Sequence, residues 1–240
     1  MDELFRIKDL CMAFGEKGVL ENIDLTIRRG EILAIIGPSG SGKTTLLRIL
    51  NFFEKPTCGS LKFDGMDIGE INDIRRRMSL LFQTPAIFNA SVFDNVAYGL
   101  KVRGIDKKTI GKKVGDALSI VGLSGLEKQK ARTLSGGEAQ RMAFARAIVY
   151  DPEILLLDEP TASLDPANVA KIEEIIRRVR DERGTTIIIA THNIPQVRRI
   201  ADRVGILLDG VLIEVNDKEK IFTAPQDARS AAFIKGEMVY

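Results

Sequence analysis

One short glycine-rich segment constrains this chain more than any other stretch of its sequence. Residues Gly37–Thr44 read Gly-Pro-Ser-Gly-Ser-Gly-Lys-Thr; the apolar run Ile32–Ile36 precedes them, and a helical pattern from Lys43 to about Asn51 follows. A strand, a glycine loop and a helix in this order bring several backbone N–H groups to the positive end of the helix, where they can hold phosphate. A merely flexible loop is the alternative, and these flanking elements argue against it. We therefore predict nucleotide binding.

The residues of this loop have separate expected tasks. Lys43 supplies a mobile positive charge for the β- and γ-phosphates, and the Thr44 hydroxyl is placed to ligate Mg²⁺. The expected ligands of this loop are therefore a nucleotide and Mg²⁺. The predicted nucleotide contacts in this segment are Gly37, Pro38, Ser39, Gly40, Ser41, Gly42, Lys43, Thr44 and Thr45.

The remaining pattern is that of an α/β fold, because apolar runs alternate with longer amphipathic stretches. Further strands are expected at Met78–Phe82, Ile154–Leu157, Thr186–Ala190 and Val204–Leu208. Asn168–Arg183 reads as a helix that ends before Gly184, and Glu173 and Glu174 are spaced to pair with Arg177 and Arg178. An antiparallel layer is expected from the alternating segments Leu4–Phe14, Ile23–Ile27 and Leu61–Phe63.

Between about Ser91 and Tyr150 the strand pattern gives way to helical patterning. We expect one domain over residues 1–240, with a core lobe of about 1–85 and 152–240 and a helical lobe of about 90–150. The net charge of +2 does not indicate a nucleic-acid partner. No apolar run approaches the roughly 18–20 residues that span a bilayer, and the N-terminus lacks signal-peptide features, so we expect a cytosolic chain. Cys11 and Cys58 lack metal-ligand spacing and are expected to be reduced.

Two carboxylates, Asp158 and Glu159, end the apolar run that begins at Ile154. Successive side chains of a strand point to opposite faces, so the two should do different work. Asp158 fits a Mg²⁺ ligand, and Glu159 fits a general base for the water that attacks the γ-phosphate. Charges at the tip of a strand that leaves the core are the alternative, which the phosphate loop makes the weaker one.

A third segment, Leu134–Glu138, reads Leu-Ser-Gly-Gly-Glu and begins a predicted helix through Tyr150. With the phosphate loop before it and Asp158 and Glu159 after it, the chain resembles the ATP-binding cassette (ABC) ATPases over nearly its whole length. The predicted fold class is thus the P-loop NTPase core of ABC type, with an antiparallel β layer and a helical sub-domain.

The resemblance implies that each ATP lies between two chains. Ser135, Gly136, Gly137 and Glu138 of one chain would complete the nucleotide site of the other, because one chain can hardly fold both segments onto the same ATP. The family usually has Gln where this chain has Glu138. Ser163-Leu164-Asp165 resembles the loop that crosses between the two sites.

The resemblance also assigns roles to three single residues. His192, the one histidine of the chain, is expected to contact the γ-phosphate, and Gln83 to contact Mg²⁺ and the attacking water. Phe14 stands where the family places a Tyr that stacks on adenine. The competing interpretations are a structural histidine, a polar strand end and a core aromatic.

The apolar residues that follow Gln83 fit a groove for a short helix of a membrane subunit, with core packing as the alternative. They include Ile87, Phe88, Val92 and Phe93. The predicted partners are a second copy of the chain, transmembrane permease subunits and, indirectly, an extracytoplasmic substrate-binding protein. The expected location is the cytoplasmic face of the membrane.

The predicted function is therefore the ATPase of an ABC importer. Segments Phe88–Gly104 and Phe233–Tyr240 look like those of tungstate importers, with phosphate and polar amino acid importers as alternatives. A soluble ABC ATPase that acts on DNA, ribosomes or iron–sulfur assembly is the rival class. Neither the long coiled coil nor the second cassette typical of such proteins is present in this sequence.

Overall fold

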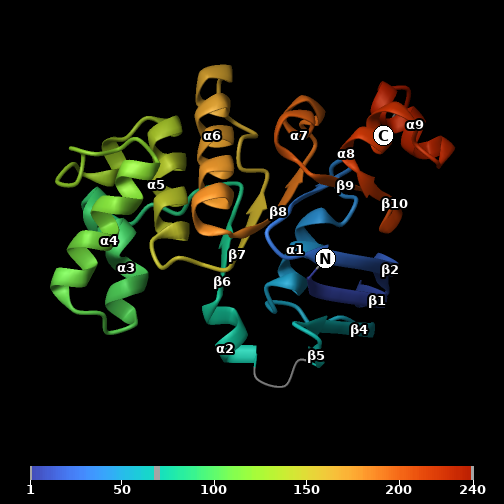
Figure 1. The fold of residues 1–240 in the computed structure, drawn as a ribbon, viewed down its shortest axis with the longest axis horizontal. Coiled ribbons are helices and arrows are strands. Elements are labelled where there is room, and N and C mark those ends of the chain that lie inside the picture. The colour runs from blue at the N-terminus through green and yellow to red at the C-terminus, as the bar shows by residue number, and fades with distance from the viewer. Residues whose placement is uncertain (1, 68–70, 239–240) are drawn as a thin grey trace.

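The computed structural model describes residues 2–67 and 71–238, which form two sheets and their flanking helices (Figure 1). An antiparallel sheet has the strand order β2-β1-β4-β5, with bounds Lys17–Arg28, Glu3–Phe14, Cys58–Phe63 and Met66–Asp67. A larger sheet has the order β10-β9-β3-β8-β7-β6, with bounds Val211–Asp217, Arg203–Leu208, Ile32–Ile36, Thr186–Thr191, Ile154–Asp158 and Met78–Leu81. Its strands are parallel except for β10.

The helices lie around the larger sheet, with α1 on one side and α6 and α7 on the other (Figure 1). Their bounds are α1 (Lys43–Leu50), α2 (Ile71–Arg76), α3 (Val92–Val102), α4 (Lys107–Ile120), α5 (Gly136–Ile148), α6 (Pro166–Arg183), α7 (Ile194–Ile200), α8 (Lys218–Thr223) and α9 (Ala228–Lys235). A 3₁₀ turn covers Ala131–Thr133. None of the helices in the described ranges is long and apolar enough to cross a membrane.

Strand β3 explains how one sheet supports two hydrophobic cores. Its residues are all buried, and alternate side chains point to opposite faces. Ile32 and Ile36 belong to the core beneath α6 and α7, whereas Leu33 and Ile35 pack with α1 and the antiparallel sheet. Burial on both faces is the reason that this strand is apolar at every position.

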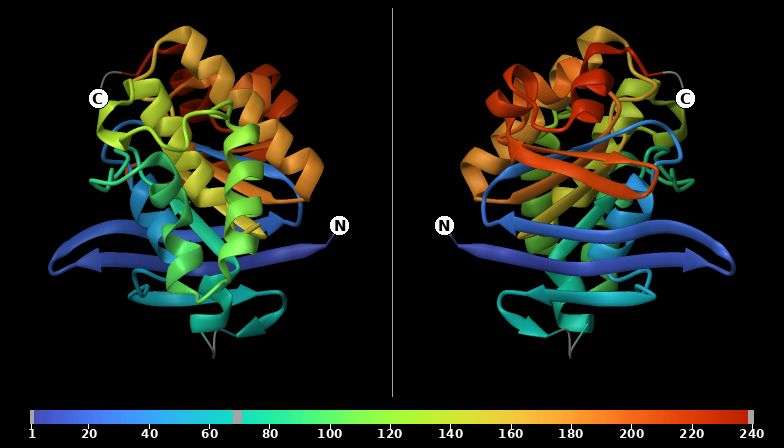
Figure 2. Two further views of the ribbon diagram at one scale, coloured as in Figure 1. Left: turned by 90° about the vertical axis from the view of Figure 1, so that its left-hand side faces the viewer. Right: turned by 90° about the vertical axis from the view of Figure 1, so that its right-hand side faces the viewer.

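The two longest strands of the antiparallel sheet, β1 and β2, form a hairpin that runs across the larger sheet (Figure 2). Helices α3, α4 and α5 form a separate group beyond the β6 edge (Figure 1). The sequence prediction of an α/β fold with an antiparallel layer and helical elements is confirmed. The last residues of the expected C-terminal resemblance, Val239 and Tyr240, lie outside the described residues.

Helix ends follow local capping chemistry. Asp165 caps α6 through the backbone N–H groups of Ala167 and Asn168, and Gly184 ends the helix in the left-handed region at φ 65°. Helix α5 is shorter than predicted at both ends, because Ser135 is its N-terminal cap and the helix ends at Ile148 rather than at Tyr150.

The prediction that Glu173 and Glu174 pair with Arg177 and Arg178 within α6 is wrong. Glu173 pairs instead with Arg199 of α7 at 2.7 Å, and Arg178 pairs with Glu182 at 2.8 Å. Glu173 is buried, so tertiary packing decides its partner.

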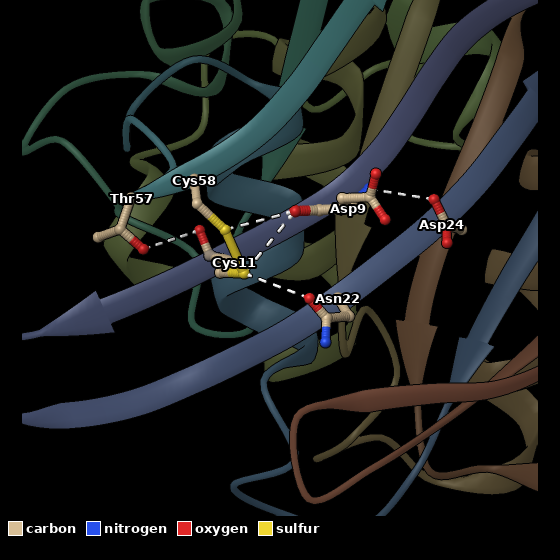
Figure 3. Close-up of a disulfide and its surroundings, with 6 residues drawn as sticks. All are labelled: Asp9, Cys11, Asn22, Asp24, Thr57 and Cys58. Carbon is tan, nitrogen blue, oxygen red and sulfur yellow. Dashed lines mark hydrogen bonds between the residues drawn. A yellow bond between two sulfur atoms is a disulfide. The ribbon is translucent and has the colours of Figure 1, made fainter.

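The cysteines contradict the sequence prediction, because Cys11 and Cys58 form a disulfide between β1 and β4 (Figure 3). The register of the two antiparallel strands places these residues opposite each other, with Cα atoms 4.9 Å apart. Spacing along the sequence could not show this, because the pairing depends on which strands become neighbours.

We expect this disulfide to stabilise the fold by constraining the unfolded chain across a sequence separation of 47. Reduction should lower the free energy of unfolding by about 2–4 kcal/mol. Urea denaturation with and without dithiothreitol measures the effect, with Cys11→Ser/Cys58→Ser as a control that should not respond to the reductant. Equal midpoints for the wild-type chain in both conditions would contradict the cross-link.

Candidate functional site

The predicted site residues meet because three parallel strands end at one edge of the larger sheet. Ile36 of β3 lies beside Thr191 of β8, and Asp158 of β7 lies beside Ala190 of β8. The chain leaves these strands at Gly37, Glu159 and His192, so three segments that are far apart in sequence begin side by side.

Close backbone contacts hold the phosphate loop in shape. Gly42 has φ 104°, and a Cβ on Gly37 would lie 2.0 Å from the carbonyl oxygen of Leu207. The Ser41 hydroxyl is buried and has no hydrogen-bond partner within the described part of the chain. A buried hydroxyl within this loop suits a ligand that is rich in acceptor oxygens, such as a nucleotide phosphate.

Lys43 lies along this loop and is only 7% exposed. Its Nζ donates to the carbonyl oxygens of Gly37 and Pro38, at 2.8 Å each. Burial lowers the pKa of the Lys43 amine, and the carboxylates of Glu159 and Asp158 oppose that shift. A desolvated ammonium that lies along the phosphate loop is well suited to bind an anionic group.

Thr44 and Asp158 come together as the sequence predicted. The Thr44 hydroxyl donates to the two carboxylate oxygens of Asp158 at 2.9 and 3.1 Å. Burial raises the pKa of Asp158, whereas the Thr44 hydrogen bond lowers it. A hydroxyl and a buried carboxylate beside a phosphate loop are hard oxygen donors, and such a donor set fits Mg²⁺.

Glu159 adopts a conformation that sequence alone did not indicate. It follows β7 with φ 46°, in the left-handed region, instead of continuing the alternation of the strand. Its carboxylate contacts His192 Nδ1 at 2.8 Å and accepts a hydrogen bond from Thr191 Oγ1 at 3.2 Å. A turn, rather than strand pleating, therefore separates Glu159 from Asp158. Strained backbone of this kind is common where a side chain is held for chemistry.

Thr191 is a site residue that the sequence analysis missed. Its hydroxyl donates to Glu159 and accepts from the backbone N–H of Asn193, which joins the ends of β7 and β8. Its place directly before His192, at the end of a predicted strand, is the signal that could have identified it.

Gln83 and Phe14 lie at the ends of their strands. Gln83 is exposed just beyond β6. Phe14 ends β1 beside the hairpin turn and is 48% exposed, so core burial, the alternative interpretation, is wrong. The exposed ring leaves a face for stacking.

The Ser135–Glu138 segment forms a capping box at the start of α5. The Glu138 carboxylate accepts from the backbone N–H of Ser135 at 2.8 Å and from its hydroxyl at 2.7 Å. These hydrogen bonds hold the pKa of Glu138 below its usual range. The segment Ser135–Glu138 includes Gly136 and Gly137. Within the described ranges, no hydrogen bond or ion pair joins this segment to the phosphate loop Gly37–Thr44.

The apolar loop after Gln83 borders a groove of about 250 Å³, whose lining includes Leu81, Phe82, Pro85, Phe88, Tyr98, Arg146 and Tyr150. Asn95, buried in α3, holds this loop by pairing with the backbone N–H and carbonyl of Phe88. Phe88 is 41% exposed, whereas Val92 is fully buried in the core, so including Val92 in the docking surface was wrong. Val92 belongs to the buried core that also contains residues of α5.

Comparison with known proteins decides the family. A family model described as ABC transporter matches residues 20–162. The chain belongs to the ABC transporter family. It is an ATP-binding subunit of that family and an ATPase.

Similar proteins match nearly the whole chain. The phosphate import ATP-binding protein PstB 2 of Natronomonas pharaonis is 48% identical, over 95% of this chain and 84% of its own length. A probable anion import ATP-binding protein of Haloferax volcanii is 42% identical, over 97% of this chain and 87% of its own.

Two solved structures share the fold of this ABC subunit. The structure of cbiO1 from Clostridium perfringens, part of the ABC transporter complex cbiONQ, has a TM-score of 0.88 at 32% identity, covering 99% of this chain and 97% of that one. A bacterial ABC transporter cassette with a dimeric structure has a TM-score of 0.80 at 30% identity, covering 90% of this chain and 99% of that one.

Glu159→Gln should lower ATP hydrolysis by on the order of 10²–10⁴ while ATP still binds, because the amide keeps the shape but loses the basic carboxylate. Phosphate release by the purified protein measures this. Glu174→Gln, on the exposed face of α6, is the matched control and should hydrolyse ATP normally. Near-normal turnover of Glu159→Gln rules out its role as base.

Lys43→Ala should weaken nucleotide binding and remove the thermal stabilisation that Mg-ATP confers, because stabilisation follows site occupancy. Melting temperatures with and without Mg-ATP test this against Lys112→Ala, an exposed lysine of α4. An ATP-induced shift in Lys43→Ala equal to that of the wild type contradicts the assignment.

Proposed function

We propose that this ABC ATPase drives the import of an oxyanion, with phosphate as the leading substrate. The observation that carries the ATPase part is the site itself, where Thr44 meets Asp158 and Glu159 meets His192 at one sheet edge. Both curated relatives described above carry import names, one for phosphate and one for an anion, which supports an anionic cargo. Tungstate is the second candidate, favoured by the Phe88–Gly104 segment.

The proposed chemistry divides the work among side chains of this chain. Bound Mg²⁺ would supply charge compensation for the phosphates, with Thr44, Asp158 and Gln83 as the residues that hold it. Glu159 orients a water and takes its proton, while Thr191 fixes the carboxylate. His192, 59% exposed and hydrogen-bonded to Glu159 through Nδ1, presents its other ring nitrogen toward the γ-phosphate site. Phe14 stacks on adenine.

A second copy of the chain completes each site in this proposal. Ser135 and the N–H groups at the start of α5 would grip the ATP bound by the partner's phosphate loop. Among the described residues of one chain, no hydrogen bond or ion pair joins these two segments, and a related cassette is dimeric, which supports a shared site. The capping box gives Glu138 the additional task of presenting Ser135.

The groove beside Phe88 is the proposed docking site for a permease on the cytoplasmic face of the membrane. It follows Gln83, which would feel the γ-phosphate, so a shift of Gln83 on ATP binding would move the groove wall. A core lobe with the sheets and a helical lobe with α3, α4 and α5 would then move about this hinge. A substrate-binding protein would deliver cargo from the far side of the membrane.

Phe88→Asp should abolish co-purification with the permease and ATP-driven uptake, because it removes the exposed apolar ring that the permease helix would pack against. Phe53→Asp is the matched control, since Phe53 has a similar exposure, 48% against 41%, and borders a different cavity. Intact uptake in vesicles containing Phe88→Asp would refute the docking site.

The cargo can be tested in the same vesicles by loading the binding protein with different anions. Phosphate-loaded binding protein should raise the ATPase rate; a larger rise with tungstate would favour the second candidate. Stimulation by an amino acid or sugar system instead would contradict the oxyanion proposal and leave the ATPase assignment intact.

A further inference from the structure

Helix α5 is tied to the segment that follows the catalytic strand β7. The buried side chain of Gln140 donates to the carbonyl oxygen of Pro160 at 2.9 Å. One residue along, Arg141 Nη1 donates to Asn168 Oδ1 of α6 at 2.8 Å. The helix that begins with the Ser-Gly-Gly segment is therefore attached at two adjacent positions to the region after Glu159.

Asn168 lies at the centre of this attachment. Its side-chain amide donates to Asp165 Oδ2, and its backbone N–H donates to Asp165 Oδ1 at 3.1 Å. Asp165 is the last residue of the Ser163–Asp165 loop and the cap of α6. A single neutral side chain thus joins Arg141 of α5 to the end of that loop.

Arg141 depends on this arrangement because it is only 8% exposed. Its Nε is buried and has no hydrogen-bond partner among residues 2–67 and 71–238. An acceptor for Nη1 is therefore important, since buried charged donors without partners are costly. Asn168 Oδ1 is that acceptor.

Packing at the second glycine of the Ser-Gly-Gly segment is a separate observation. A Cβ on Gly137 would lie 2.5 Å from Cγ and from Oδ1 of Asn168. Asn168 thus fills the space beside Gly137, so a side chain here would displace Asn168 from its hydrogen bonds to Arg141 and Asp165, even though alanine is favoured in helices. The start of α5 rests directly on Asn168.

We propose that Asn168 is a positioning residue that fixes the Ser135–Glu138 segment relative to the Ser163–Asp165 loop. Both elements then meet the partner chain as one rigid unit. This inference rests on the shared ATP site proposed above. The new element is that Asn168, a residue of α6 outside the nucleotide site, determines how the Ser135–Glu138 segment is oriented.

Asn168→Ala should lower kcat for ATP hydrolysis and weaken ATP-dependent dimerisation, each by about tenfold or more, because a hydrogen bond to a charged partner is lost. Nucleotide affinity of the single chain should stay within about twofold, since the phosphate loop is untouched. A residue of merely structural importance would lower the melting temperature and the nucleotide affinity together. Glu174→Ala, exposed on the same helix, is the control and should change none of these.

A double variant tests the proposal further, even if each single variant has only a small effect on ATP hydrolysis. Gly137→Ala should lose the ATP-dependent dimer through contact with the Asn168 side chain, whose clashing atoms are absent in Asn168→Ala. The double variant Gly137→Ala/Asn168→Ala should therefore hydrolyse ATP at the level of Asn168→Ala, above Gly137→Ala. A double variant no better than Gly137→Ala, or wild-type turnover in Asn168→Ala, would overturn the proposal.

The variant Ser135→Arg distinguishes failure of the positioning role of Asn168 from failure of the shared ATP site. Its bulk and charge should block closure of the shared site while nucleotide affinity stays normal. If Ser135→Arg still dimerises with ATP and hydrolyses it, the shared site is wrong. If Ser135→Arg is inactive but Asn168→Ala behaves as wild type, only the positioning role fails.

Discussion

Parallel pairing of β3, β8 and β7 is the constraint on which the rest of this structure depends. It aligns the carboxyl ends of three buried strands, so that a cation, two carboxylates and a histidine from distant parts of the sequence gather at one edge. The strands can be parallel only because helices cover the sheet and connect them. The apolar residues that build the core therefore also place the chemistry.

Burial gives that edge its chemical character. Lys43 and Asp158 are both largely removed from water. Burial lowers the pKa of Lys43 and raises the pKa of Asp158, and each shift favours the neutral form of the side chain. Such charges are costly unless they are compensated. Their proposed ligands, phosphate and Mg²⁺, carry the opposite charges, so nucleotide binding would relieve the cost that folding incurs.

Local sequence patterns predicted most of the fold and of the candidate site. The features that they missed depend on pairing between strands that are far apart in the sequence. The phosphate loop, the strand before Asp158 and the end of α6 at Gly184 follow from neighbouring residues, and sequence alone sufficed. The disulfide of Cys11 and Cys58 depends on which strands become neighbours. The Thr191 contact and the left-handed turn at Glu159 likewise depend on how β7 meets β8, which spacing along the chain does not reveal.

The measurement that tests the shared site most directly is cross-linking between two different chains in a Cys11→Ser/Cys58→Ser/Glu159→Gln background. One chain carries Ser39→Cys in the phosphate loop, and the other carries Ser135→Cys at the start of α5. The account predicts that mixing them with an added oxidant, copper phenanthroline, gives a disulfide-linked dimer in the presence of Mg-ATP and little without nucleotide. If ATP produces no such dimer, while a single chain carrying both substitutions links Ser39→Cys to Ser135→Cys internally, the shared site is contradicted.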